Sequence, residues 1–231
     1  MTDTLPDVVV VGQRRPHGSG AAFPSPGGGG GGGVNNPGGI HQNEIEENPE
    51  APPEPFNPCA DPVTAEEWNV DAAAAEAAKA IAAHAAAAGE GDLNVRERGA
   101  YLYRGANGQI LVGPITAGPA FVNGGFGSVA LDMTGIDPTS IVGSVHSHAV
   151  GNHLPSDVGP NGEPGDIQHL GWMTGISATS RLYIVAQNLV GAGQTPYNQV
   201  NVYTSQNAQS ARDNFQPGPE VNPDAQPCPG G

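Results

Sequence analysis

The sequence predicts an α+β domain made of one long helix, a mainly antiparallel sheet and a second, shorter helix. Three observations lead to this prediction. Residues 65–88 are mostly Ala, the best helix former, and Gly89 follows them as a natural stop. From residue 91 onward, short β-rich segments alternate with turn residues. Residues 166–173 then return to a helical pattern, so the central sheet is expected to be flanked by helices.

The long helix is expected to start at Asp61-Pro62-Val63-Thr64, with Thr64 and Glu67 forming a capping box. Its expected buried face repeats at helical spacing and is thin, as suits close packing on a sheet. The residues of this face are Val70, Ala74, Ala77, Ile81 and Ala88.

A hairpin is expected after this helix, with strands at 99–104 and 109–115. Asn107-Gly108 is expected to supply the positive φ angles of its turn. Asp166 is expected to be the N-cap of the late helix. Further strands are predicted over residues 128–133, 140–147, 181–186 and 199–204.

Gly and Pro are concentrated in residues 1–60, which hold 12 Gly and 10 Pro, including seven consecutive glycines. Such a segment cannot bury enough apolar surface to fold, so it is predicted to be a disordered tail or linker. Within it, the valines at 8–11 can add a strand to a sheet but cannot fold alone. Residues 61–210 are the predicted folded domain, and residues 211–231 are a predicted disordered C-terminal tail.

The charge balance excludes some classes of partner. The 231 residues carry 8 basic and 23 acidic side chains, a formal net charge of −15. Nucleic acids and anionic membrane surfaces favour basic patches, so neither is expected as a partner. The sequence has no apolar run of membrane-spanning length, and its first residues lack the pattern of a signal peptide. We therefore expect a protein that is cytoplasmic or is exported by a signal-independent system.

The two cysteines, Cys59 and Cys228, flank the predicted domain and have no metal-ligand spacing. They are either isolated cysteines in the tails or an end-to-end disulfide. The disulfide requires that the chain reach an oxidising compartment.

The candidate chemistry is concentrated where an apolar strand ends in His146-Ser147-His148. Residues i and i+2 of a strand lie on the same face about 7 Å apart, so the two imidazoles can converge on one ion. The next 18 residues contain His153, Ser156, Asp157 and Asp166. Two histidines and one carboxylate, with a fourth position left open, are the ligands of a hydrolytic zinc site.

A hydrolytic site also needs a general base. Glu97 lies just before the first strand of the hairpin, where the fold can bring it alongside the histidine strand. Alternatively, Glu97 is a solvent-exposed side chain between Arg96 and Arg98 with no part in catalysis.

His146-Ser147-His148, the loop with Ser156, and a glutamate about fifty residues upstream resemble the JAB/JAMM (MPN-domain) zinc metallopeptidases. Bacterial JAB-like domains attached to Rhs-type and other polymorphic-toxin or phage-tail proteins look more similar still. In those domains a Glu-x-Gly-x-x-x-Tyr strand precedes a Gly-x-x-His-Ser/Thr-His strand, which residues 97–103 and 143–148 match here. The resemblance covers roughly residues 60–205.

The resemblance implies a JAB/MPN-like (cytidine-deaminase-like) fold and a Zn²⁺ cofactor. It implies hydrolysis of a peptide or isopeptide bond in a protein or peptide substrate by zinc-activated water. His146 and His148 match the metal-binding pair of the family. Glu97 matches the glutamate that deprotonates the water, and Ser156 matches the serine that helps to stabilise the oxyanion.

The carboxylate half of the motif departs from the family. The family aspartate corresponds to position 159, where this sequence has Gly159. The third ligand is then Asp166, which opens a helix whose N-terminus favours a carboxylate, or Asp157. If it is Asp166, Glu163 takes the relative position of the family serine, and the role of Ser156 changes.

Two alternatives to this zinc peptidase stay open. A JAB-like domain without the aspartate spacing is expected to be an inactive binding module. A cupin-like metal protein is the second alternative, although a cupin needs a glutamate four or five residues after the second histidine, where this sequence has Asn152 and His153.

Overall fold

The computed structural model describes residues 9–12, 57–90, 93, 95–121, 127–149, 151–158, 164–188 and 197–229. The chain divides into two compact units, one formed by Met1–Pro16 with Pro58–Gly231 and the other by His17–Asn57. Only Asn57 of the second unit is described, so the architecture below is that of the first unit. Most of the tail predicted over residues 1–60 lies outside the described residues.

Three helices and eight strands are found in the described part of the chain. The helices are α1 (Pro62–Ala87), α2 (Asp166–Ile176) and α3 (Ala208–Asn214), and a short 3-10 helix spans Pro138–Ser140. The strands are β1 (Val9–Gly12), β2 (Arg96–Arg104), β3 (Ile110–Val112), β4 (Thr116–Ala120), β5 (Gly127–Ala130), β6 (Ile141–Ser147), β7 (Arg181–Gln187) and β8 (Asn198–Tyr203). None of the helices described here is long and apolar enough to span a bilayer.

Six strands form one mixed sheet in the order β3-β2-β6-β7-β8, with β4 also paired to β2. β6 and β7 run parallel, and the other pairings of this sheet are antiparallel. β1 and β5 form a separate antiparallel ladder. The predicted α+β class and mainly antiparallel sheet are therefore confirmed. The described strands leave this sheet open, which does not fit the barrel of a cupin.

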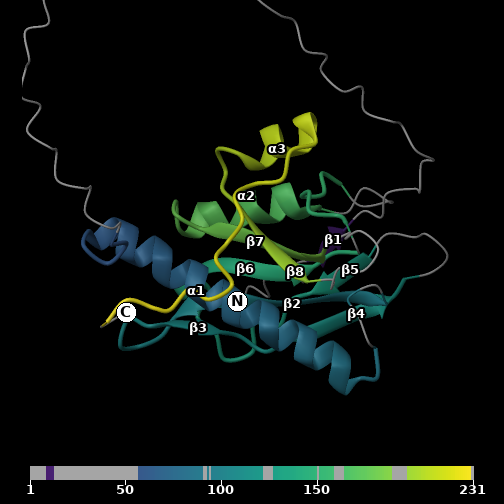
Figure 1. The fold of residues 1–231 in the computed structure, drawn as a ribbon, viewed down its shortest axis with the longest axis horizontal. Coiled ribbons are helices and arrows are strands. Elements are labelled where there is room, and N and C mark those ends of the chain that lie inside the picture. Colours follow the sequence, from purple (N-terminus) through teal and green to yellow (C-terminus); the bar gives the residue numbers. More distant parts are fainter. Residues whose placement is uncertain are drawn as a thin grey trace, which may run out of the picture. The chain divides into compact units, whose positions relative to one another are not determined.

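Helices cover both faces of the six-stranded sheet (Figure 1). α1 packs on one face, against Ala100 and Leu102 of β2 and Tyr183 of β7. α2 and α3 pack on the other face, against Tyr101 of β2 and Leu182 of β7. Because successive side chains of a strand point to opposite faces, the same two strands supply both hydrophobic cores. The central strands are therefore buried on both sides.

The N-terminus of α1 differs from the predicted capping box of Thr64 and Glu67. The Asp61 carboxylate caps the helix instead, accepting hydrogen bonds from the backbone N–H groups of Val63 and Thr64, both at 3.0 Å. Pro62 then occupies the first helical position, where its missing N–H costs nothing. Asp61 is the better cap because its short side chain lies directly before the proline.

Two turn glycines behave as the sequence predicts. Gly89, just after α1, has a φ of +74°, and Gly108 in the β2–β3 turn has a φ of +89°. Asn107 does not share the positive φ expected of it, because one left-handed residue suffices to close this longer turn. The predicted buried face of α1 is confirmed except at Ala88, which is exposed because it ends the helix.

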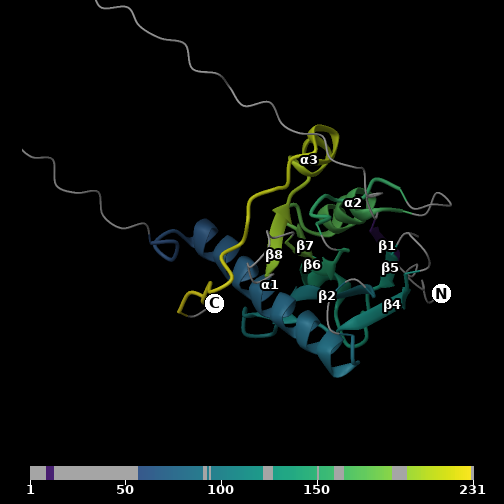
Figure 2. The same cartoon turned by 45° about the vertical axis from the view of Figure 1, so that its right-hand side comes forward.

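The C-terminal segment packs against the domain, which corrects the prediction of a disordered tail over residues 211–231. The backbone N–H of Val202 in β8 donates to the Pro219 carbonyl (3.0 Å), and the Val221 N–H donates to the Val200 carbonyl (2.8 Å). These bonds join backbone groups, so they form despite a composition rich in Pro and Gly. Figure 2 shows the yellow segment running from α3 past β8 toward α1.

The end of this segment is fixed to α1. The Trp68 indole N–H donates to the Gln226 carbonyl (2.7 Å). Cys228 forms a disulfide with Cys59, just before the helix, with a Cα–Cα distance of 5.5 Å. Of the two states that the sequence leaves open for these cysteines, the structure contains the end-to-end bridge.

Candidate metal centre

The strand that carries the two histidines lies in the middle of the sheet. β6 pairs with β2 on one side and with β7 on the other, and all seven of its residues are buried. His146 lies opposite Gly99 of β2 and Ile184 of β7. A Cβ at position 99 would lie 2.8 Å from the His146 Cβ, so only glycine leaves room for the imidazole. His146 and His148 share the face of the sheet that α2 covers, because Ile184 belongs to the core beneath α2.

Asp166 comes to this face from the first turn of α2. Gly165, not Asp166, is the N-cap, which corrects the predicted cap and leaves the Asp166 side chain free to face the sheet. A Cβ at position 165 would lie 2.4 Å from the Asp157 carbonyl, so the close approach of the preceding loop requires glycine there.

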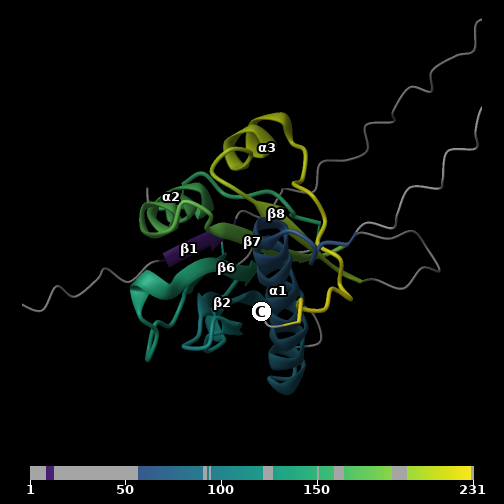
Figure 3. The same cartoon turned by 90° about the vertical axis from the view of Figure 1, so that its left-hand side faces the viewer.

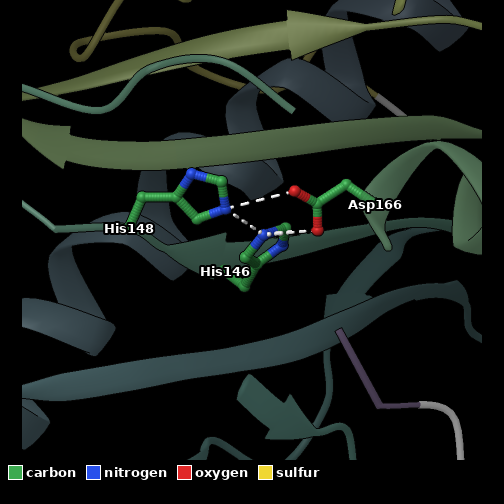
Figure 4. A group of neighbouring side chains, drawn as sticks. All are labelled: His146, His148 and Asp166. Carbon is green, nitrogen blue, oxygen red and sulfur yellow. Dashed lines mark hydrogen bonds and ion pairs between the residues drawn. The ribbon is translucent and has the colours of Figure 1, made fainter. Parts of the chain in front are cut away.

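The three side chains meet at one point (Figure 4). His146 Nε2 and His148 Nε2 are 2.9 Å apart, His146 Nε2 is 3.0 Å from Asp166 Oδ1, and His148 Nε2 is 3.2 Å from Asp166 Oδ2. A tetrahedral zinc site with metal–nitrogen bonds of about 2.0–2.1 Å places its ligand atoms about 3.3 Å apart. The separations between the three side chains are therefore close to those between ligand atoms of such a site, with one Asp166 oxygen nearest to each histidine.

The electrostatics of this group suit a divalent cation. Burial alone raises the pKa of Asp166, but the charges of His146 and His148 and their hydrogen bonds hold that pKa well below its usual range. Burial lowers the pKa of His148, an effect that the neighbouring Asp166 charge only partly offsets. At neutral pH the group therefore offers a carboxylate and an unprotonated imidazole, the forms that bind metal. His–His–Asp is also a donor set that zinc accepts.

Glu97 lies on the same face of the sheet and is only 1% exposed. Gly99 is paired with His146, and Glu97 precedes Gly99 by two residues, so Glu97 and His146 lie on neighbouring strands and on the same face of the sheet. Its carboxylate lies against β5, where a Cβ at Gly127 would be 2.6 Å from the Glu97 Cδ. The alternative of a solvated glutamate is therefore excluded.

Ser156 contacts Asp166 directly. Its backbone N–H donates to Asp166 Oδ2 (2.6 Å), and its Oγ accepts from the Asp166 N–H (3.0 Å). Ser156 is 2% exposed. The structure thus places this serine where it orients the carboxylate.

Two other candidates from the sequence lie outside the group. Asp157 is partly exposed, and its Oδ1 accepts a hydrogen bond from Gln168 (3.4 Å). His153 is nearly buried, and its carbonyl accepts a hydrogen bond from the Tyr203 hydroxyl. The structure therefore brings Asp166, and not Asp157, to the two histidines. Positions 159 and 163 lie outside the described residues.

An aromatic group of His169, Trp172 and Tyr101, which the sequence pattern did not reveal, lies on the same face of the sheet as α2. His169 lies on α2 one turn after Asp166 and is 1% exposed. Its ring stacks on Trp172 with a centroid distance of 5.7 Å and contacts the Tyr101 ring at the same distance. Burial, and then the charge of His146, lowers the pKa of His169 to about 3. The sequence signal for His169 is its spacing of three residues from Asp166, which puts both side chains on one side of a helix.

Several polar atoms of this region are buried without hydrogen-bond partners among the described residues. They are Tyr101 Oη, Ser144 Oγ, His146 Nδ1 and both ring nitrogens of His169. Tyr101 and Ser144 are opposite each other in the β2–β6 register. Unpartnered buried groups destabilise a fold and are uncommon away from functional sites.

Comparison with models of known families found no match to this chain, and a search of curated proteins found none.

Proposed function

We propose that this chain is a zinc-dependent metallopeptidase or isopeptidase of the JAB/JAMM type, with His146, His148 and Asp166 as its metal ligands. The observation that carries the proposal is the meeting of these three side chains, whose ligand atoms are 2.9–3.2 Å apart and whose exposure is 0%. A buried group of this kind is costly unless it holds an ion. The substrate class is a protein or peptide.

The residues around the ligands support a hydrolytic role. Zinc at this position supplies a Lewis acid that polarises a carbonyl and lowers the pKa of water to about 7. We assign to Glu97, which is buried on the strand next to the histidine strand, the acceptance of a proton from the attacking water and its return to the leaving amine. Ser156 holds Asp166 through two hydrogen bonds, one from its backbone N–H to the carboxylate and one from the Asp166 N–H to its Oγ.

Two features of the architecture support the proposal. The histidine strand is central in an open, mixed sheet with helices on both faces, and the glutamate strand is its direct neighbour. A role within a bacterial effector, toxin or phage-tail system rests on the resemblance alone.

A JAB-like binding module without activity is the second candidate. The observation that favours it is the burial of Glu97 and of all three ligands, which leaves them no contact with solvent for a substrate. Gly159, at the position of the family aspartate, points in the same direction.

The first test is metal content by inductively coupled plasma mass spectrometry on the full chain. We expect one zinc per native chain, loss of zinc in His148→Ala and Asp166→Asn, and retention in Asp157→Asn, the matched control. A native chain that stays zinc-free after incubation with excess metal contradicts the proposal.

The second test separates the two candidates. The zinc-loaded chain is screened against peptide and isopeptide substrates beside Glu97→Gln. Hydrolysis that falls about 100-fold or more in Glu97→Gln, with zinc retained, supports the enzyme. Bound zinc without hydrolysis of any substrate supports the binding module.

A further inference from the structure

β5 has an unusual position in the fold. It rests on β4, where Thr116 Oγ1 donates to the Ala130 carbonyl (2.7 Å) and a Cβ at Gly118 would be 1.7 Å from the Ser128 carbonyl oxygen. It does not join the six-stranded sheet; its ladder partner among the described strands is β1. Without β1, the backbone groups along this edge of β5 would have no strand to pair with.

The same strand touches the candidate general base. A Cβ at Gly127, the first residue of β5, would be 2.6 Å from the Glu97 Cδ. Gly127 is paired with Gly12 of β1. Paired residues of an antiparallel ladder have their Cα atoms about 4.5–5.5 Å apart, so Gly12 lies beside the residue that rests against Glu97.

β1 also contacts α2, the helix that carries Asp166. Figure 3 shows β1, in purple, between α2 and the strands below it. A peptide strand from the beginning of the chain thus lies between an element that touches Glu97 and an element that supplies a metal ligand.

The candidate site is closed in this arrangement. His146, His148 and Asp166 are 0% exposed, and Glu97 is 1% exposed. Any polypeptide substrate needs one of the surrounding elements to move. β1 is joined to the next element, α1, through the longest connection, residues 13–61, and among the described strands it pairs with β5 alone. A two-stranded pairing of four residues is marginally stable in water, so β1 can leave without unfolding the domain.

We propose that the edge of β5 is a binding site for an extended peptide and that residues 9–12 are its cis ligand, which blocks the metal centre until another peptide strand replaces them. Main-chain hydrogen bonds of the β5 edge supply the affinity, as in other cases of strand addition. Gly127 leaves room for the Glu97 carboxylate, and its partner in β1 is also a glycine, so a competing strand with a small residue opposite Gly127 fits the same place. The blocking role rests on the proposed function; the peptide site itself does not.

The test uses the full chain with Val9→Pro and Val10→Pro together. Alternate residues of an antiparallel strand donate to the partner strand, so this pair removes a donor in either register. The control is Val9→Ile with Val10→Ile, which keeps both N–H groups and the β-branched character. Zinc-loaded proteins are mixed with excess chelator, and zinc loss is followed with a chromogenic indicator.

We expect zinc loss to be about tenfold faster in the proline variant, because local opening controls access of the chelator, and unchanged in the isoleucine variant. A synthetic peptide of residues 7–13, added to the proline variant, is expected to restore the slow rate. Equal rates in the native and proline proteins overturn the blocking role.

Hydrogen exchange of residues 127–130 tests the peptide site independently of zinc. Protection of these amides is expected to fall in the proline variant and to return with the peptide. Unchanged protection overturns the assignment of β1 to this edge. If the native chain binds no zinc, the proposed function fails, and the exchange measurement alone still decides the peptide site.

Discussion

Ser156 and Asp166 are joined by two reciprocal hydrogen bonds across ten residues of sequence. The Ser156 N–H donates to Asp166 Oδ2 (2.6 Å), and the Asp166 N–H donates to Ser156 Oγ (3.0 Å). One bond orients the carboxylate, and the other satisfies a backbone donor in the first turn of α2. The serine therefore connects the loop after the histidine strand to the helix that completes the metal group.

The first prediction concerns this serine. Ser156→Ala keeps the backbone bond to the carboxylate but removes the acceptor for the Asp166 N–H. We expect zinc affinity to fall about 10-fold to 100-fold, because the first turn of α2, which carries the Asp166 ligand, is then less firmly held. The measurement is competition with a chelator of known affinity. Ser140→Ala is the control, since the Ser140 hydroxyl bonds only to the nearby Asp137 carbonyl (2.6 Å). Equal affinities of the native and Ser156→Ala proteins contradict the positioning role.

The second prediction concerns a buried hydroxyl. Tyr101 is 0% exposed, and its Oη has no hydrogen-bond partner among the described residues. Tyr101→Phe is expected to raise the free energy of unfolding by about 1 kcal/mol, because it removes an unsatisfied group and little volume. Tyr183→Phe is the matched control and is expected to lower it by about 1 kcal/mol, since the Tyr183 hydroxyl donates to Asp71 (2.7 Å). Both are measured by urea unfolding, and a destabilised Tyr101→Phe protein rejects this account.

The third prediction is a pH dependence. The pKa of buried His169 is lowered to about 3, mainly by burial, from the ordinary value of 6.5; the ionisable groups around it are His146, Asp166 and Tyr101. As pH falls below about 6.5, the unfolded chain takes up a proton at this residue before the folded chain does. The free energy of unfolding is therefore expected to be highest above this pH and to decline toward pH 3, by at most about 1.4 kcal/mol per unit from this residue.

His169→Phe provides the comparison, because a phenyl ring keeps the contacts with Tyr101 and Trp172. Unfolding is measured by urea titration on chelator-treated protein between about pH 4 and pH 7, the interval in which this histidine changes charge on unfolding. A shallower slope in the variant is expected. If the free energy of unfolding changes equally with pH in the two proteins, His169 contributes nothing to the pH dependence.

The fourth prediction concerns the disulfide. Cys59 and Cys228 are 169 residues apart, so the bridge restricts almost the whole unfolded domain. Replacing both with Ser is expected to lower the free energy of unfolding by about 2–5 kcal/mol. Native protein treated with a reductant should match the double variant. A native protein with the same stability before and after reduction would show that the bridge does not form in solution.

The local part of the fold could be predicted from sequence because it depends on near neighbours. The Ala-rich run after Asp61, the stop at Gly89 and the β-rich run before His146 are encoded by propensity and period, and each forms as expected. The predicted cap of α1 lies three residues too late, because Asp61 and Thr64 are both good N-cap residues and the sequence alone does not decide between them.

The C-terminal segment could not be predicted in this way. Its composition is that of a tail, yet Val221 and Ala225 are buried and Cys228 is covalently joined to Cys59. The bonds that hold it are backbone hydrogen bonds to β8 and one covalent link, and neither depends on apolar composition.

For the metal group, the sequence by itself determined that His146 and His148 share one face, because the period of a strand is two residues. Only the tertiary structure decided between Asp157 and Asp166, brought the strand of Glu97 beside the histidine strand, and placed β1 in contact with both β5 and α2. These relationships depend on strand register and on the packing of α2 over the sheet. Register and packing are set by contacts between residues far apart in the chain, which no local pattern specifies.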